Sequence, residues 1–201
     1  MLDASSKAAN DWQLILNYIN TVAANFNVNP QCVRMAVIRY ATSAQVAFSL
    51  STHNNINSVQ QAVRSLTLLG GTSNNLAGAL QLLRTQVFPS NVVRSGARLI
   101  ALIVTDRLQP CSSQIITEAN NVKRMGVFVV GVGINQNRLV DSTCMRRVVS
   151  CNYIVAPAYN QLRGQILTQT VQYICAATCV SKYHVLVRIG SVLFPRRNNT
   201  I

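Results

Sequence analysis

The chain has 201 residues, enough for one α/β domain with a sizeable buried core. Hydrophobic residues make up 49% of it and no apolar run reaches the ~18 residues of a transmembrane helix, so neither a disordered chain nor membrane insertion is expected. Eighteen lysines and arginines against five acidic residues give a net charge of +13. This charge either keeps the protein soluble or attracts an acidic partner.

The first part of the chain predicts one long helix, a hairpin and two short helices. Apolar residues recur with helical spacing from Trp12 to Phe26, and alternate from Val46 to Leu50 as in a half-buried strand. The short gap at Thr42 and Ser43 indicates an antiparallel hairpin. The predicted elements are a helix at 8–27, strands at 33–41 and 44–51, and helices at 56–66 and 76–87.

The second part alternates buried strands with helices. The run "LIALIV" at 99–104 is unbroken apolar sequence, typical of a parallel strand covered on both faces, and "GVFVVGVGI" at 126–134 is similar. The other predicted elements are helices at 113–124, 138–149 and 160–177, and a short strand at 153–157. We therefore predict an α/β fold: a doubly wound, mostly parallel six-stranded sheet with one antiparallel edge strand and helices on both faces.

Function in such a sheet usually lies beyond the carboxyl ends of the parallel strands. Asp3 ends the first strand, Asp106 ends the run "LIALIVTD", and Thr72 lies in the glycine turn "GGTSNN" before a helix. Oxygen ligands from such residues, with Ser5, suit a hard cation such as Mg²⁺. Alternatively, the two aspartates only cap strand–helix turns.

Together, these segments resemble the von Willebrand factor type A domain. Its metal-ion-dependent adhesion site has a D-x-S-x-S motif, a threonine in a G-G-T turn and an aspartate at a "VTDG"-like strand end. The chain matches at Asp3, Ser5, Thr72 and Asp106, and its order of elements is similar over about 1–178. The resemblance is greatest to extracellular matrix members such as matrilins, collagen-associated domains and invertebrate byssal or shell matrix proteins.

The chain departs from this pattern at two charged positions. Lys7 replaces the last serine of the motif, and Arg107 replaces the glycine after Asp106. A cation beside a metal site opposes metal binding, so we expect weak or no Mg²⁺ binding and an ion cluster of Asp3, Lys7 and Asp106. We also expect Lys7 and Arg107 to concentrate positive charge at this edge and to contact an acidic partner directly.

The resemblance also suggests limits for the domain. Only Met1 and Leu2 precede Asp3, where the family has several apolar residues, so we expect the first strand to begin before Met1. We expect one domain over 1–179 and a tail or linker over 180–201.

Six cysteines without a CxxC pair, and only two histidines, make a zinc site improbable and leave disulfides or buried free thiols. In the fold implied by the resemblance, Cys32 is within reach of Cys175 or Cys179. Cys144 and Cys151 flank a helix-to-strand turn and are expected to pair. Cys111 is expected to be left over.

We interpret the chain as a non-catalytic, secreted adhesion or matrix module, because the resemblance implies it and no nucleophile–base pair is found. Its expected partner is a matrix protein, collagen-like first, bound at a degenerate metal site. The alternative is a structural protein that binds acidic polymers, such as sulfated glycans or mineral-associated matrix, through general basic charge. Nucleic acid is not expected, since no aromatic stacking row or recognition motif occurs.

Overall fold

The computed structural model describes residues 1–108, 111–136 and 138–179, apart from the side chains of Lys7, Thr178 and Cys179. Its strands are β1 (Leu2–Asp3), β2 (Val37–Tyr40), β3 (Ala44–Phe48), β4 (Ile100–Thr105), β5 (Phe128–Ile134) and β6 (Ile154–Ala156). They form one six-stranded sheet in the order β3-β2-β1-β4-β5-β6, parallel except for the β2–β3 hairpin at one edge. The predicted fold class is confirmed.

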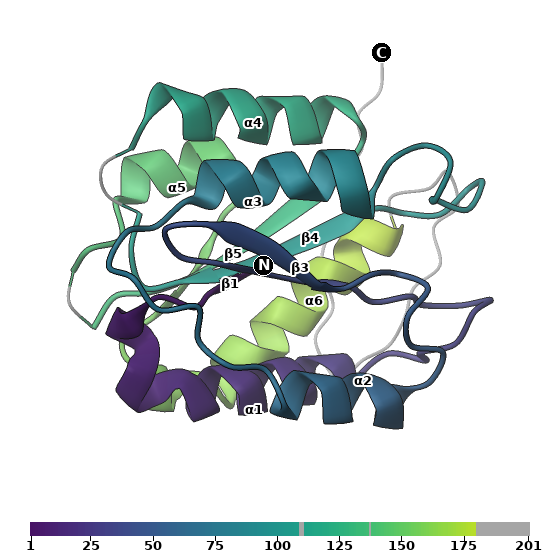
Figure 1. Ribbon diagram of the computed structural model, residues 1–201, viewed down its shortest axis with the longest axis horizontal. Coiled ribbons are helices and arrows are strands. Elements are labelled where there is room, and N and C mark those ends of the chain that lie inside the picture. Colours follow the sequence, from purple (N-terminus) through teal and green to yellow (C-terminus); the bar gives the residue numbers. More distant parts are fainter. Residues whose placement is uncertain (109–110, 137, 180–201) are drawn as a thin grey trace, which may run out of the picture.

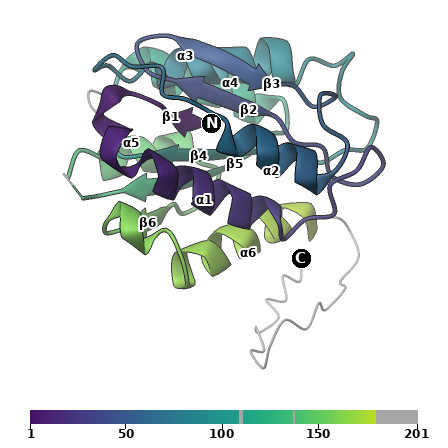
Figure 2. The ribbon, with the colours of Figure 1, turned by 60° about the horizontal axis from the view of Figure 1, so that its bottom comes forward.

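Six α-helices of the described residues cover the two faces of the sheet (Figures 1 and 2). They are α1 (Trp12–Ala23), α2 (Ile56–Arg64), α3 (Leu76–Leu82), α4 (Ser113–Arg124), α5 (Ser142–Val148) and α6 (Gln165–Cys179). A 3₁₀ helix, η1 (Ser6–Asp11), leads into α1, a π turn, η2 (Leu83–Val87), extends α3, and a second 3₁₀ helix, η3 (Tyr159–Gln161), precedes α6. Helices α3, α4 and α5 lie on one face and α1, α2 and α6 on the other. Within the described part of the chain, no helix combines the length and apolar character needed to cross a membrane.

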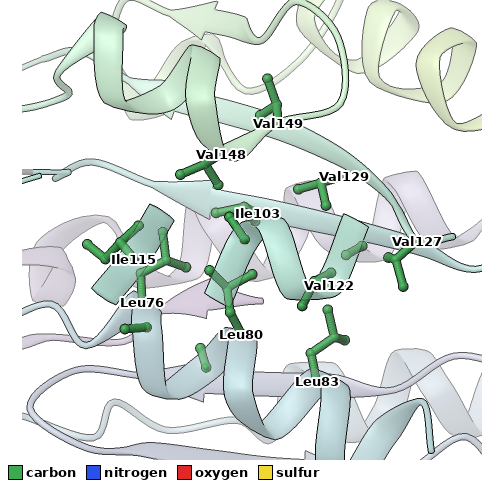
Figure 3. Packing of buried hydrophobic residues seen from close by; sticks show 14 of the residues in the cluster. Leu76, Leu80, Leu83, Ile103, Ile115, Val122, Val127, Val129, Val148 and Val149 are labelled. Carbon is green, nitrogen blue, oxygen red and sulfur yellow. The ribbon is translucent and has the colours of Figure 1, made fainter. Parts of the chain in front are cut away.

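The unbroken apolar strands contribute side chains to two hydrophobic cores, one on each face of the sheet. Ile103 and Val104 are adjacent and completely buried, yet they pack into different clusters because successive side chains of a strand point to opposite faces. Figure 3 shows the first cluster, where Leu80 of α3 and Val122 of α4 meet Ile103. The sheet is therefore packed between two helical layers. This packing fixes the carboxyl ends of the strands, and with them the positions of the loops that follow.

Two predicted boundaries are wrong in ways that matter for the site. Strand β2 begins at Val37 rather than at 33, because Asn29 accepts the backbone N–H groups of Gln31 and Cys32 and closes a loop there. Helix α5 begins at Ser142 rather than at 138, because the Asp141 side chain accepts the N–H of Cys144 at 3.0 Å and caps the helix. Cys144 thus lies in the first turn of α5, near the carboxyl end of β5.

Candidate functional site

Two aspartates lie at the carboxyl ends of the neighbouring strands β1 and β4. Asp3 is the last residue of β1 and Asp106 directly follows β4, with only 2% and 3% of their surfaces exposed. Burial first, and the negative charge of Asp106 second, raise the pKa of Asp3 from its ordinary 3.8 to about 6, against hydrogen bonds from Ser5 and Thr105. The structure therefore brings together the two carboxyl groups that the sequence placed at this edge, and they repel each other when both are charged.

Ser5 lies beside Asp3 in the segment that leaves β1. It is buried, and its backbone N–H donates to Asp3 Oδ1 at 3.2 Å. The segment is held on both sides, since the Ala4 N–H donates to the Tyr40 carbonyl and the Ala4 carbonyl accepts from Leu69. Ser5 therefore has a fixed position next to the first carboxylate, as the motif predicts.

The glycine turn packs against the same segment. Gly70 and Gly71 have φ angles of +74° and +75°, in the left-handed region that favours glycine. A Cβ atom at Gly71 would lie 2.4 Å from Thr42 Oγ1, and the Gly71 carbonyl accepts both the N–H and the hydroxyl of Ser6. Thr72 follows this turn and is exposed, so the glycines place the threonine at the surface of the site.

Asn74 is the residue that joins these segments, and the sequence analysis did not identify it. Its amide Nδ2 is within hydrogen-bond distance of Asp3 Oδ2 (2.7 Å), Thr105 Oγ1 (3.2 Å) and the Arg107 carbonyl (2.8 Å). Its Oδ1 accepts the N–H of Leu76 at the start of α3. One neutral side chain thus ties the glycine turn to both strand ends, close to the buried carboxylates.

Arg107 places a positive charge beside Thr72. Its side-chain Nη1 donates to the Thr72 carbonyl at 2.9 Å, while its backbone pairs with Leu139 in an isolated bridge. Its Nε is buried and has no hydrogen-bond partner among the described residues. The guanidinium therefore connects the glycine turn to the 107–108 segment and keeps a donor unsatisfied.

Lys7 is the remaining predicted site residue. Its backbone belongs to η1, directly after the Asp3–Ser5 segment, but its side chain lies outside the described residues. The ion cluster of Asp3, Lys7 and Asp106 stays a prediction.

Two buried tyrosines border the carboxyl groups, and the sequence analysis did not identify them either. Burial, followed by the negative charge of Asp106, raises the pKa of Tyr159. Burial, followed by the negative charge of Asp3, raises the pKa of Tyr40 well above its ordinary value. Both phenols stay neutral at physiological pH and enclose the site in apolar surroundings.

Over residues 1–167, the sequence matches the family model of the von Willebrand factor type A domain. The chain belongs to this family. The resemblance inferred from Asp3, Ser5, Thr72 and Asp106 is therefore confirmed as a family relationship.

Relatives with this domain are extracellular matrix and adhesion proteins. The chain is 21% identical to von Willebrand factor A domain-containing protein 2 of Xenopus laevis over 87% of its length, and it covers 22% of that protein. It is 27% identical to matrilin-1 of Gallus gallus over 75% of its length and covers 30% of that protein. It is 24% identical to integrin alpha-2 of Bos taurus over 68% of its length and covers 12% of that protein. The chain thus spans less than a third of each of these three relatives.

The fold also matches solved structures. Proximal thread matrix protein 1 from the mussel byssus aligns with a TM-score of 0.79 and 20% identity, over 87% of this chain and 44% of that one. A structure of the same mussel protein has a zinc-occupied MIDAS motif, that is, a metal-ion-dependent adhesion site, and aligns equally well. These likenesses show the von Willebrand factor type A fold in the chain.

Domains of this family can bind a divalent cation, and part of the site fits one. Asp3, Ser5 and Asp106 offer hard oxygen donors, and a cation between the two carboxylates would offset both the burial and the repulsion by Asp106 that raise the pKa of Asp3. Within the described ranges, no group of three or more His, Cys, Asp or Glu gathers to hold a metal, so the cation would rely on hydroxyls and water. The Thr72 side fits less well, because the positively charged Arg107 guanidinium is held at the Thr72 carbonyl and would repel a cation.

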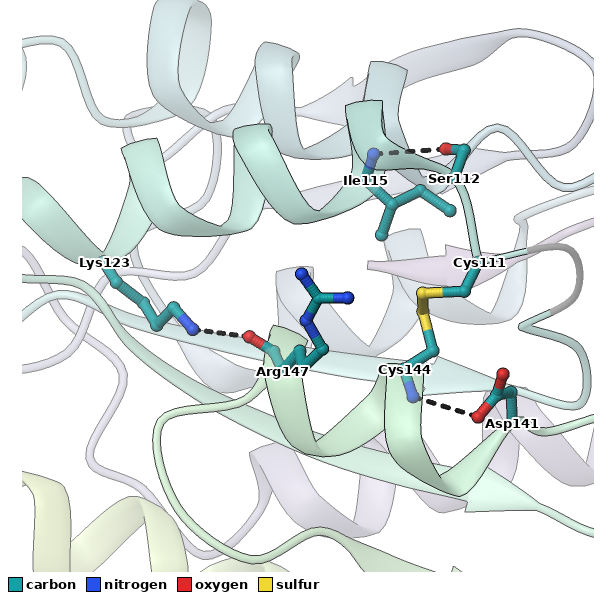
Figure 4. Close-up of a disulfide and its surroundings, with 7 residues drawn as sticks. All are labelled: Cys111, Ser112, Ile115, Lys123, Asp141, Cys144 and Arg147. Carbon is teal, nitrogen blue, oxygen red and sulfur yellow. Dashed lines mark hydrogen bonds between the residues drawn. A yellow bond between two sulfur atoms is a disulfide. The ribbon is translucent and has the colours of Figure 1, made fainter.

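One disulfide lies at the top face of the domain, which is the edge of the sheet at the carboxyl ends of the parallel strands, where Asp3, Thr72 and Asp106 lie. It corrects the predicted pairing. Cys111, expected to be left over, is bonded to Cys144, with Cα atoms 5.6 Å apart (Figure 4). The predicted Cys144–Cys151 bridge is wrong because capping by Asp141 places Cys144 in the first turn of α5, beside the loop after β4.

The second predicted bridge is also not formed. Cys32 is exposed with a free thiol, which excludes its expected bond to Cys175, and Cys151 is exposed and free as well. The Cys179 side chain lies outside the described residues. The disulfide therefore joins the segment after Asp106 and Arg107 to α5, next to the candidate site rather than at the opposite end of the sheet.

Proposed function

We propose that the chain is a non-catalytic adhesion or matrix module, in the extracellular space, whose top face binds a matrix protein through an acidic group of that partner. The observation that carries the proposal is the Arg107 guanidinium. Its Nη1 donates to the Thr72 carbonyl, its residue directly follows Asp106, and its Nε has no hydrogen-bond partner among the described residues. An incoming carboxylate needs a positive charge at this place, because Asp3 and Asp106 would otherwise repel it. Collagen-like proteins are the first candidates, since the relatives include collagen chains.

Metal binding at Asp3, Ser5, Thr72 and Asp106 is proposed to be weak in the natural sequence, with Mg²⁺ the expected ion. Calorimetry with Mg²⁺ and Mn²⁺ should show little heat for the wild type and clear binding for Lys7→Ser, which removes the competing ammonium and adds a hydroxyl donor. Adding Asp106→Ala to that variant should abolish the binding. Tight binding by the wild type, or none by Lys7→Ser, would disprove this account of the site.

Replacing Arg107 by alanine should weaken binding to an acidic matrix partner by about 10-fold to 100-fold, the usual effect of a charge-assisted hydrogen bond. Surface plasmon resonance on immobilised collagens and acidic matrix proteins measures this loss. The matched control is Arg124→Ala, because Arg124 is exposed at the C-terminal end of α4, at the other end of the sheet. Equal losses in both variants would contradict a site at the top face.

The net charge of +13 supports a second candidate, a structural module that binds acidic polymers or sulfated glycans without a defined site. Arg124, Arg146 and Arg147 are exposed near the C-terminal ends of α4 and α5 and spread the positive charge beyond the top face. Binding to heparin in this case falls steeply with salt and responds equally to the Arg107 and Arg124 variants. The same plasmon experiment, repeated in rising salt, therefore separates the two functions.

A further inference from the structure

The charged residues of the chain are divided between the two edges of the sheet. We call the edge opposite the top face, at the amino ends of the parallel strands, the lower edge. Of the five acidic residues, Glu118 lies in the middle of α4 and is paired with Arg84 at 3.3 Å. The other acidic residues end strands or begin helices at the top face: Asp3, Asp11, Asp106 and Asp141. Among the described residues, no acidic one therefore lies at the lower edge.

Basic residues gather at the lower edge on two neighbouring helices. Lys123 and Arg124 lie in the last turn of α4, and Arg146 and Arg147 lie in the last turn of α5. The three arginines are exposed and Lys123 is half-buried. Within the described part of the chain, none of the four is paired with a carboxylate. We call Lys123, Arg124, Arg146 and Arg147 the basic row.

The contacts of these residues show how the row is built. Lys123 Nζ reaches from α4 to the carbonyl of Arg147 on α5, at 2.6 Å (Figure 4). The Arg146 guanidinium lies over the ring of Tyr153, 5.8 Å from its centre, and Tyr153 directly precedes β6. The positive charges therefore follow one another from α4, across α5, to the start of β6.

Helix dipoles alone do not account for this concentration of charge. A cation in the last turn is favoured by the negative end of any helix. However, α1, α3 and α6 have no basic residue in the last turn, and α2 has only Arg64. Two basic residues on each of two adjacent helices place like charges side by side, and these charges repel each other until an anion binds between them.

The two helices that carry the basic row are held together at both ends. At the top face, the disulfide joins Cys111, just before α4, to Cys144 in the first turn of α5. At the lower edge, the hydrogen bond from Lys123 to Arg147 joins the helix ends. A ligand of the basic row therefore does not have to order the helices when it binds, which reduces the entropic cost of binding.

We propose that the basic row is a binding site for a sulfated polysaccharide, at the edge of the sheet opposite the top face. Guanidinium groups bind oxyanions through two parallel hydrogen bonds, and a linear sulfated chain can place successive anions along the row. Nucleic acid fits less well, because Arg146 covers the ring of Tyr153 on which a base would stack. The choice of a polysaccharide rests on the proposed extracellular location, whereas the site does not depend on the top face.

Calorimetry with a heparin oligosaccharide, at about 0.15 M salt, tests the proposal. The row variant combines Arg124→Gln, Arg146→Gln and Arg147→Gln. The matched control has the same net charge, removes exposed arginines outside the row, and combines Arg64→Gln, Arg138→Gln and Arg163→Gln. The row variant should bind about 10-fold to 100-fold more weakly than the wild type, because it loses charge-assisted hydrogen bonds. The control should lose less than about 3-fold, because distant surface charges are screened.

Two further measurements complete the test. Arg107→Ala should leave heparin affinity unchanged, because Arg107 lies at the top face. Polyglutamate at equal charge concentration should compete less well than heparin, because its flexible chain loses more entropy on binding. Equal losses in the row variant and the control, a loss in Arg107→Ala, or equal competition by polyglutamate would each overturn the proposal. The proposed function is tested with matrix proteins at the top face, so the two results are independent.

Discussion

Replacing Cys111 and Cys144 together by serine is expected to lower the free energy of unfolding by about 3–4 kcal/mol, because the disulfide closes a loop with a sequence separation of 33. The loop contains α4 and β5, so its closure restricts a large part of the unfolded chain. Cys144 is buried against the first core cluster, and serine there would add a small loss of packing. Urea denaturation of the double variant measures the loss, which corresponds to a Tm lower by about 10 °C.

Controls for this experiment exist in the same chain. Cys32 and Cys151 are exposed and free, so Cys32→Ser and Cys151→Ser should change the free energy of unfolding by less than about 0.5 kcal/mol. Peptide mapping without reductant should recover Cys111 joined to Cys144. A double variant as stable as the wild type would show that the bridge does not form in solution.

The sheet could be predicted from the sequence because two of its inner strands, β4 and β5, are buried on both faces. The apolar runs that became β4 and β5 have no polar residue at alternate positions, and only a sheet covered by helices on both sides accommodates such strands. The helical spacing of apolar residues over α1 then predicted a helix that covers one face of the sheet. The fold class could thus be predicted because the burial of whole strand and helix faces imposes regular patterns of apolar residues on the sequence.

The cysteine pairing could not be predicted in the same way. It depended on one helix boundary, and helix ends are set by single capping contacts rather than by a repeated pattern. Asp141 starts α5 four residues later than expected and so moves Cys144 to the carboxyl end of the sheet. The motif "VDSTC" contains this signal, because an aspartate three residues before Cys144 is a good N-cap.

At the site, the positions of Asp3, Ser5 and Asp106 followed from strand ends, but the role of Asn74 did not. Its contacts span three segments separated by more than 30 residues, and no spacing along the chain reveals them. The burial of Tyr159 beside Asp106 is equally non-local. The sequence therefore predicted that the two carboxyl groups of Asp3 and Asp106 meet, whereas the neutral groups that hold and enclose them required the folded chain.

In the presence of a chelator, the wild type is expected to lose stability relative to Asp3→Asn as the pH rises from about 4 to about 7. Burial and the charge of Asp106 raise the pKa of Asp3 in the folded protein to about 6, above its ordinary 3.8. The folded state therefore binds a proton that the unfolded state has released, and the free energy of unfolding falls across this interval. The difference between the two pKa values corresponds to about 3 kcal/mol.

The comparison with Asp3→Asn isolates this effect from the N-terminus, which acts in the opposite direction. Burial lowers the pKa of the Met1 amine from 8.0 to about 5, so that group adds stability as the pH rises from 5 to 8 in both proteins. Asparagine cannot accept all the hydrogen bonds from Ser5, Asn74 and Thr105, which gives a constant offset but no pH dependence. Urea denaturation at several pH values should show the difference growing toward neutral pH and levelling above about 7. A difference that stays constant over this range would show that burial and the charge of Asp106 do not raise the pKa of Asp3 in the folded protein.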